Sequence, residues 1–137
     1  MMPRSVLTML CCACSLLTFS LSSEAAYFDG MEAYRVNDFK TALREFKASD
    51  DDVKSEYMLG IMFEKGQGAK TDFAEAAAWY LKAADKGNAA AQYRLGRLYE
   101  RGQGVEQNRE EALKMYRKSA RQGYQDAKQA LKRIEGQ

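Results

Sequence analysis

A self-repeat with a period of 36 residues organises the back two-thirds of the chain and sharply limits the folds open to it. Leu59-Gly60 recurs as Leu95-Gly96. The tripeptide Gly66-Gln67-Gly68 recurs as Gly102-Gln103-Gly104 at the same offset. Three alanines follow the same rule: Ala76, Ala84 and Ala91 return as Ala112, Ala120 and Ala127. A fixed period of this length is typical of a stacked helical array, and such arrays mostly present extended binding surfaces.

The spacing of apolar residues between the glycines is helical. Ala91, Leu95 and Leu98 fall at i, i+4 and i+7, which places them on one face of a helix. No segment alternates apolar and polar residues for long enough to indicate a strand. The pattern predicts two helix–loop–helix units, the first at 53–65 with 72–86 and the second at 89–101 with 108–122.

Short polar residues and glycines predict where these helices begin and end. Asp72 with Glu75, and likewise Asn108 with Glu111, fits a capping box. In that motif the first side chain bonds the free amides of the helix and the acid three residues later bonds back. Four glycines mark helix ends that favour a left-handed residue: Gly66, Gly87, Gly102 and Gly123.

The two ends of the array are predicted to be a shorter hairpin and a single helix. Several residues of 38–46 match 72–80 at an offset of 34, so a helix from Tyr27 to Val36 is expected to turn at Asn37-Asp38 into a second helix. Residues 124–134 form one amphipathic helix, which suits a capping element. The predicted fold class is therefore all-α: a short α/α solenoid of about three helical hairpins plus a C-terminal capping helix.

Residues 1–25 have the layout of a cleaved secretory signal peptide. Arg4 supplies a positive start, an apolar stretch runs from Val6 to about Leu21, and Ser23-Glu24-Ala25 places small residues where a signal peptidase reads them. The apolar run of about 16 residues is shorter than the roughly 20 that a spanning helix needs, which disfavours a retained membrane anchor. A lipoprotein is also disfavoured, because no Leu-small-small triplet precedes the cysteines of this segment: Cys11, Cys12 and Cys14.

Cleavage would leave residues 26–137 as a single domain without Cys or His, which an oxidising compartment cannot crosslink. We therefore expect the periplasm of a Gram-negative bacterium. Residues 26–72 carry 7 basic and 10 acidic side chains, whereas residues 73–137 carry 13 basic and 8 acidic ones. The basic residues of 73–137 would suit an acidic partner or an anionic membrane surface. The preferred interpretation is that they form a solvated outer surface of helices.

Residue types needed for familiar catalysis are missing from 26–137. Without His or Cys there is no familiar zinc site and no Ser-His or Cys-His nucleophile pair, so no metal, cofactor or enzymatic activity is expected. Asp50-Asp51-Asp52 is interpreted as a charged linker, because Glu56 is poorly placed to close a calcium loop. No strand precedes the Gly-Gln-Gly loop, which disfavours a phosphate loop, and aromatics do not interleave with a basic patch, which disfavours nucleic acid.

Two copies of one motif resemble the Sel-one-like repeat (SLR), a relative of the tetratricopeptide repeat. The second copy reads Leu95-Gly96-x-x-Tyr99-x-x-Gly102-x-Gly104-Val105, followed by Ala112, Tyr116 and Gly123. The first copy matches in register, with Phe63 for the Tyr and Ala69 for the Val. Full repeats are expected at about 53–88 and 89–124, and the front hairpin fits a generic tetratricopeptide-like unit. The resemblance implies scaffolding or adaptor work in envelope processes, or regulation of a membrane-bound signalling protein.

In an array of this kind the first helices of successive units line the concave side, and residues there that packing does not need are candidates for binding a partner. By register the candidates are Tyr57, Ile61, Tyr93, Arg94 and Arg97, with Arg35 as a further one. Tyr and Arg are over-represented in interface hot spots. The alternative for Tyr57 and Tyr93 is packing between units as core aromatics. A core position is expected of five other residues: Leu95, Tyr99, Trp79, Tyr80 and Tyr116.

The leading hypothesis is an exported, non-enzymatic protein–protein interaction module that binds a segment of another protein or a peptide in its concave groove. Two alternatives stay open. One is an immunity protein or inhibitor of a secreted toxin or enzyme. The other is a hydrolase of the cell envelope, which the absence of His and Cys disfavours. No membrane span is expected after cleavage, and the oligomeric state is left open.

Overall fold

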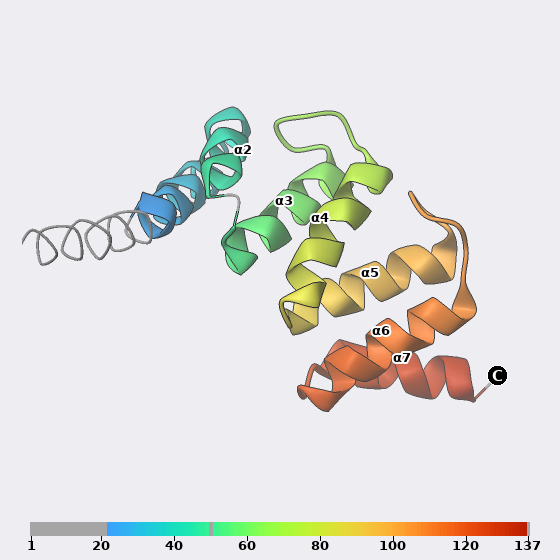
Figure 1. Cartoon of the computed structure of the whole chain (residues 1–137). Coiled ribbons are helices and arrows are strands. Elements are labelled where there is room, and N and C mark those ends of the chain that lie inside the picture. Colours follow the sequence, from blue (N-terminus) through green and yellow to red (C-terminus); the bar gives the residue numbers. More distant parts are fainter. Residues whose placement is uncertain (1–21, 50, 137) are drawn as a thin grey trace, which may run out of the picture.

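The computed structural model describes residues 22–49 and 51–136, which form seven helical segments and no strand (Figure 1). The first covers 22–35, and six follow it: α2 (Phe39–Ala48), α3 (Val53–Lys65), α4 (Phe73–Asp85), α5 (Ala89–Arg101), α6 (Arg109–Arg121) and α7 (Gln125–Glu135). The predicted all-α helical-repeat fold is confirmed. Most of the predicted signal segment, including its three cysteines, lies outside the described residues.

Consecutive helices pack as antiparallel hairpins that stack on one another. α3 pairs with α4 and α5 with α6, while α4 packs on α5 and α6 on α7. Figure 1 shows the resulting order along the chain, with α5, α6 and α7 grouped at the C-terminal end. Within the part of the chain that the structure describes, none of these helices is long and apolar enough to cross a membrane.

Each second helix of the two full repeats begins at the predicted cap, but only half of the capping box forms. The Asp72 carboxylate accepts from the Glu75 amide at 3.0 Å. The cap's own amide donates instead to the carbonyl of Phe63, at 2.9 Å, and the Glu75 carboxylate accepts from the Trp79 indole. The second repeat has the equivalent cap and cross-loop bonds. The amide of the capping residue therefore bonds the end of the preceding helix, and not the acid that the capping box predicts as its partner.

The Gly-Gln-Gly loop attaches each full repeat to the unit before it. The four predicted helix-end glycines all have positive φ, including 69° at Gly66 and 64° at Gly102, where the chain leaves α3 and α5. A Cβ on Gly104 would lie 2.1 Å from the carbonyl carbon of Phe73, so only glycine lets the loop approach that backbone. Gly68 lies against Phe39 in the same way, where the loop arches toward α2 in Figure 1.

An aromatic side chain under a glycine forms the centre of each hairpin. Tyr80 and Tyr116 are fully buried, and a Cβ added to Gly60 or Gly96 would lie 2.4 or 2.8 Å from their rings. The front hairpin repeats this contact between Gly30 and the Phe46 ring. It is therefore a third copy of the unit with a shorter loop.

The core extends as three clusters along the array and confirms three of the five expected core residues. Leu95, Tyr80 and Tyr116 are buried, whereas Trp79 and Tyr99 are only partly buried and pack on the outside of the clusters. The Trp79 indole donates to the Glu75 carboxylate, and the Lys82 ammonium lies over its ring.

Candidate binding surface

The first helices of successive hairpins lie on one side of the array. α3 contacts α5 directly, and α5 and α7 together line two surface cavities. We call the surface formed by the helical segment 22–35, α3, α5 and α7 the first-helix face. All the predicted partner-binding residues belong to these helices, but the structure uses them in different ways.

Ile61 is a packing residue rather than a surface residue. Its side chain is 8% exposed and belongs to the main core cluster of the two repeats. The prediction treated this position as one that packing leaves free. It is not free in the first repeat, because the neighbouring helix α5 packs against α3.

Tyr57 and Tyr93 both make packing contacts, and Tyr93 also lines a cavity. Both are partly buried, with ring centroids 6.0 Å from Tyr80 and 5.7 Å from Tyr116, respectively. Tyr93 also lies 5.3 Å from the Tyr124 ring and lines both cavities between α5 and α7. Tyr57 therefore packs inside the first repeat, whereas Tyr93 packs inside the second and also lines the cavities between α5 and α7.

Arg94 joins the two full repeats. Its guanidinium bonds the Glu64 carboxylate at 3.2 Å, and its side chain is 25% exposed. Burial works against the charged form, but Tyr80 and Tyr57 and then Glu64 raise the pKa of the guanidinium above its ordinary value. Its Nε is buried without a hydrogen-bond partner among the described residues. Arg94 is therefore held inside the array by structural contacts.

Sequence reasoning missed a tyrosine–carboxylate pair that recurs in both repeats. The Tyr80 hydroxyl donates to Glu64 at 2.5 Å, and the Tyr116 hydroxyl donates to Glu100 at 2.6 Å. Burial first, and the bond to the carboxylate second, raise the pKa of each tyrosine. The signal was present in the sequence, because both the glutamates and the tyrosines recur at the 36-residue offset.

Glu100 also forms an ion pair with an arginine of the last helix. Arg133 donates to its two oxygens at 2.7 and 2.9 Å, so the pair is bidentate. The bond to Arg133 is the largest of the contacts that lower the pKa of the Glu100 carboxyl, and it outweighs the effect of burial. Arg133 thus takes the place at α7 that Arg94 takes at α5.

Two surface cavities lie between α5 and α7 on the first-helix face. One cavity, of about 470 Å³, is lined by Tyr93, Arg97, Glu100, Arg101, Tyr116 and Arg133. The second, of about 430 Å³, is lined by Tyr93, Asp126, Gln129, Ala130 and Arg133. Because the two cavities share two residues, we treat them as one surface and call it the α5–α7 groove. The predicted residue Arg97 lies here, with its guanidinium 6.0 Å from the centroid of the Tyr93 ring.

Arg35 lies at the exposed end of the segment 22–35. It donates to Glu32 at 2.7 and 3.1 Å, and both side chains are more than half exposed. This contact lowers the pKa of Glu32 and raises that of Arg35. An exposed pair of this kind contributes little to stability.

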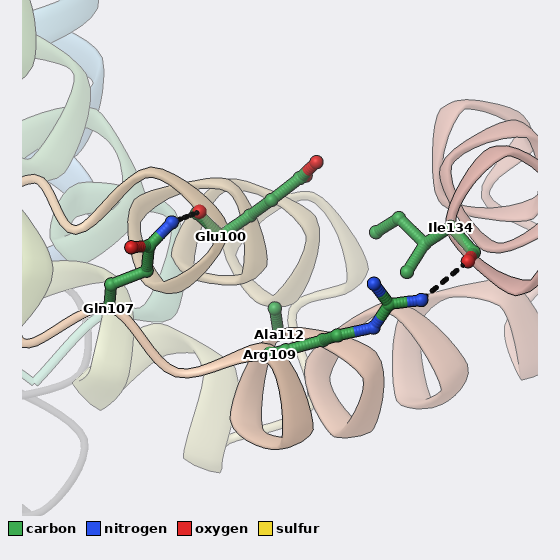
Figure 2. A pocket seen from close by; sticks show the side chains of 5 residues that line it. All are labelled: Glu100, Gln107, Arg109, Ala112 and Ile134. Atoms are coloured by element: carbon green, nitrogen blue, oxygen red, sulfur yellow. Dashed lines mark hydrogen bonds between the residues drawn. The ribbon is translucent and has the colours of Figure 1, made fainter. Parts of the chain in front are cut away.

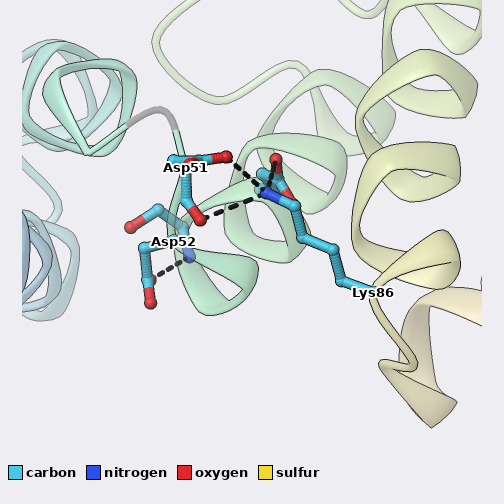
Figure 3. Close-up of polar contacts among 5 residues, drawn as sticks. Asp51, Asp52 and Lys86 are labelled. Carbon is cyan, nitrogen blue, oxygen red and sulfur yellow. Dashed lines mark hydrogen bonds and ion pairs between the residues drawn. The ribbon is translucent and has the colours of Figure 1, made fainter.

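The acidic linker before α3 has a structural role in the residues that the structure describes. Asp52 caps α3 by accepting from the Ser55 amide at 2.8 Å. The Lys86 ammonium bonds Asp51 at 2.9 Å and the buried Glu56 at 2.8 Å, as Figure 3 shows for part of this contact set. The linker is thus charged, as predicted, but it also joins the start of α3 to the end of α4. Asp50 lies outside the described residues.

A smaller cavity at the end of α7 is lined by two side chains that donate to backbone carbonyls. The Arg109 guanidinium donates to the carbonyl of Ile134 at 2.7 Å, and the Gln107 amide donates to the carbonyl of Glu100 at 2.9 Å (Figure 2). The space is about 280 Å³. Arg109 satisfies a carbonyl that the last turn of a helix leaves free, so we assign it a structural role. Over 22–49 and 51–136, no three His, Cys, Asp or Glu side chains are grouped so that they could hold a metal ion.

Comparison with known proteins shows the family. The model of the Sel1 repeat matches residues 53–88 and 89–124, which is more than half of the chain and agrees with the two expected repeats. A search of curated protein sequences finds no match.

Solved structures of Sel1 repeat proteins have the same fold. A Sel1 repeat protein from Oxalobacter formigenes is 33% identical with a TM-score of 0.74, over 78% of this chain and 46% of that one. A protective antigen of uropathogenic Escherichia coli with an SLR fold is 32% identical with a TM-score of 0.79, over 89% of this chain and 28% of that one. The cysteine-rich protein B of Helicobacter pylori is 22% identical with a TM-score of 0.64, over 80% of this chain and 94% of that one, and shows the fold alone.

The chain spans less than half the length of the first two of these proteins. Sel1 repeat proteins are typically protein–protein interaction modules, and the family is generally a non-catalytic scaffold. The matched repeats, the stacked helical hairpins and the glycine-bearing loops together show that this chain belongs to the Sel1 repeat family.

Proposed function

We propose that this chain is a non-enzymatic interaction module that binds a segment of a partner protein along its first-helix face, mainly in the α5–α7 groove. The observation that carries the proposal is the groove itself. There Tyr93 and Arg97 lie together at the edge of a cavity of about 470 Å³. Tyrosine and arginine dominate interface hot spots, since each combines a large contact area with directional hydrogen bonds.

The contrast along the face supports this location. Near α3 the face is filled by the buried Ile61 and by the ion pair between Arg94 and Glu64. Near α7 the corresponding space is open and is lined by Arg97, which is only partly buried. We therefore place the partner segment in the recess at the C-terminal part of the face.

The contacts of the buried polar groups support a binding role rather than catalysis. The two tyrosines whose pKa values are raised most, Tyr80 and Tyr116, are bonded to carboxylates. Those carboxylates are in turn bonded to Arg94 and Arg133. Perturbed groups often mark active sites, but here they recur once per repeat and hold neighbouring helices together.

We further propose that the module works in the periplasm. The proposal rests on the signal-peptide pattern of residues 1–25 and on the absence of cysteine from residues 26–137. Fractionation of bacteria that express the full chain tests it. The shorter product is expected in the periplasmic fraction with an N-terminus near Ala26. An uncleaved chain in the cytoplasm would contradict the proposal.

Site-specific photo-crosslinking tests the binding surface. A photoreactive residue is placed in the full chain at Gln129, an exposed residue of the α5–α7 groove. The matched control position is Leu81, which is 44% exposed on α4 and outside the groove. A discrete partner adduct is expected from Gln129 and not from Leu81. Equal adducts from both positions, or none from Gln129, would contradict the proposal.

A further inference from the structure

The α5–α7 groove contains three guanidinium groups, of which one is neutralised. Arg133 is held by both oxygens of Glu100. Arg97 and Arg101 line the same cavity from one side of α5, four residues apart. Neither of them makes an ion pair with a carboxylate in the part of the chain that the structure describes. The larger cavity therefore has an excess of positive charge.

The remaining charged group of the groove lies in the adjoining cavity. Asp126 lines that cavity together with Gln129 and the small side chain of Ala130. It is not among the residues that line the larger cavity with Arg97 and Arg101. The groove is thus polarised along its length, with its positive end on α5 near the Gly-Gln-Gly loop of the second repeat.

The arginines of the groove suit the binding of carboxylates. Inside the groove, Arg133 already receives a carboxylate in bidentate form, and the Tyr116 hydroxyl adds a third bond to the same group. Arg97 lies over the Tyr93 ring, with a distance of 6.0 Å to the centroid. A guanidinium supported by an aromatic ring loses less freedom when it binds, which favours recognition by such a preorganised group.

We propose, on the basis of the function proposed above, that the α5–α7 groove binds an Asp- or Glu-rich segment of the partner protein through Arg97 and Arg101. An extended peptide can place side-chain carboxylates in the cavity one after another, and the fork of each arginine matches a carboxylate in two bonds. The recess between two helices favours a peptide over a flat anionic membrane. The first repeat does not reproduce this recess, because its position equivalent to Arg97 is the buried Ile61.

The first repeat supplies a matched control. Lys65 is the counterpart of Arg101 at the 36-residue offset and is exposed at the end of α3. The test variant is Arg97→Glu/Arg101→Glu, which reverses two charges in the groove. The control Lys65→Glu reverses one charge at an equivalent surface position outside the groove. A second variant, Arg97→Gln/Arg101→Gln, removes the charges without reversing them. Circular dichroism of each variant establishes that the helical fold is kept.

Fluorescence anisotropy with a labelled oligo-glutamate peptide tests the proposal directly, with labelled oligo-glutamine as the neutral probe. The full chain is expected to bind oligo-glutamate, more weakly as salt rises, and not oligo-glutamine. Arg97→Glu/Arg101→Glu is expected to weaken binding by at least about tenfold, and the glutamine variant by a smaller factor, since charges near an interface act mainly by complementarity. Lys65→Glu is expected to change it by less than about twofold, because an exposed charge elsewhere contributes little.

Three results would overturn the proposal: equal binding of the two peptides, equal loss in Lys65→Glu and in the double glutamate variant, or binding of phosphatidylglycerol vesicles without binding of oligo-glutamate. Repeating the Gln129 crosslinking in the Arg97→Glu/Arg101→Glu chain separates this proposal from the broader one. If the partner adduct persists unchanged, the interaction module stands and acidic recognition fails. If the unaltered chain gives no adduct at Gln129, the proposed function itself fails.

Discussion

The two full repeats solve one geometric requirement with different chemistry. In the first, the end of α4 is joined to the first turn of α3 by an ion pair, Lys86 to the buried Glu56 at 2.8 Å. In the second, the equivalent positions are Gln122 and Gln92, whose amides bond at 2.9 Å. A bond therefore forms at this place in both repeats, with charge in the first and without it in the second. Buried ion pairs are often replaceable by neutral contacts for this reason, because desolvation offsets much of their attraction.

A second difference lies on the first-helix face. Position 61 is filled by isoleucine and closed over, whereas position 97 carries an arginine at the edge of the groove. The shared residues, such as Gly60 with Tyr80 and their counterparts, fix how the helices stack. What each repeat presents to a partner is decided by the few positions that differ.

The largest expected effect tests what the repeats share. Tyr80→Ala and Tyr116→Ala should each lower the free energy of unfolding by about 3–5 kcal/mol, because each removes a fully buried aromatic ring and leaves a cavity. Urea denaturation followed by circular dichroism measures the change. Trp79→Ala serves as the control and should cost less, since Trp79 is only partly buried. An equal or larger loss for Trp79→Ala would show that the assigned core is wrong.

The next effect tests the charged and neutral pairs. Lys86→Ala should destabilise the chain by about 1–3 kcal/mol, because it leaves the Glu56 carboxylate buried without its partner. We set this below the full cost of breaking a buried pair because the Lys86 side chain is 34% exposed and water replaces part of the contact. Gln122→Ala should cost about 1 kcal/mol, which is typical of one neutral hydrogen bond.

The double variant Glu56→Gln/Lys86→Gln copies the second repeat into the first. Its free energy of unfolding should lie within about 1 kcal/mol of the unaltered chain, since a neutral bond replaces the ion pair. The same urea titration measures it. A loss as large as that of Lys86→Ala would mean that the first repeat does require charge at this place.

A smaller effect is expected on the pH dependence of stability. The bond to Arg133 lowers the pKa of Glu100 in the folded chain below its ordinary value of 4.5. Its contribution is therefore complete above the unfolded pKa and is lost as the pH falls through the lower folded pKa. Glu100→Gln should flatten the acid limb of a plot of the thermal midpoint against pH. An unchanged acid limb in this variant would show that Glu100 is not coupled to folding.

The smallest expected effect on stability accompanies a change of binding. Arg97→Ile gives the second repeat the residue of the first and should alter the free energy of unfolding by less than about 0.5 kcal/mol, as surface substitutions usually do. Its thermal midpoint should therefore be unchanged while anisotropy shows weaker oligo-glutamate binding. A large gain in stability would indicate that the groove closes over isoleucine as the first repeat does.

Most of the fold was predictable because it depends on residues that recur at one offset. The periodic glycines, alanines and aromatics place the helix boundaries of both repeats within one residue. The front hairpin was harder, because its loop is shorter and a single offset does not align both of its helices. Gly30 matches Gly60 at a different offset from that of Phe46 to Tyr80. Its equivalence becomes visible only through the contact between Gly30 and Phe46.

The candidate site was predictable only in part. The register placed Tyr93 and Arg97 on α5, which lines the proposed groove, but it could not show that Ile61 is buried, since burial depends on how hairpins stack. Arg133 follows Arg97 at the 36-residue offset, but among the described residues only Arg133 forms an ion pair with Glu100, so the offset did not predict that pair. The period predicts an arginine at this position but not the carboxylate that it bonds, so the role of Arg133 emerges from the structure alone.

The docking of each Gly-Gln-Gly loop on the unit before it has a consequence for how such proteins change in length. Each repeat brings its own loop glycine, such as Gly104, and its own receiving backbone, such as that at Phe73. Because both halves of the joint belong to the 36-residue unit, a tandem duplication of 89–124 creates a complete new joint without any compensating substitution. Array length is therefore open to change by gene duplication in a single step, and each new copy adds one further position equivalent to 97 on which partner choice can diverge.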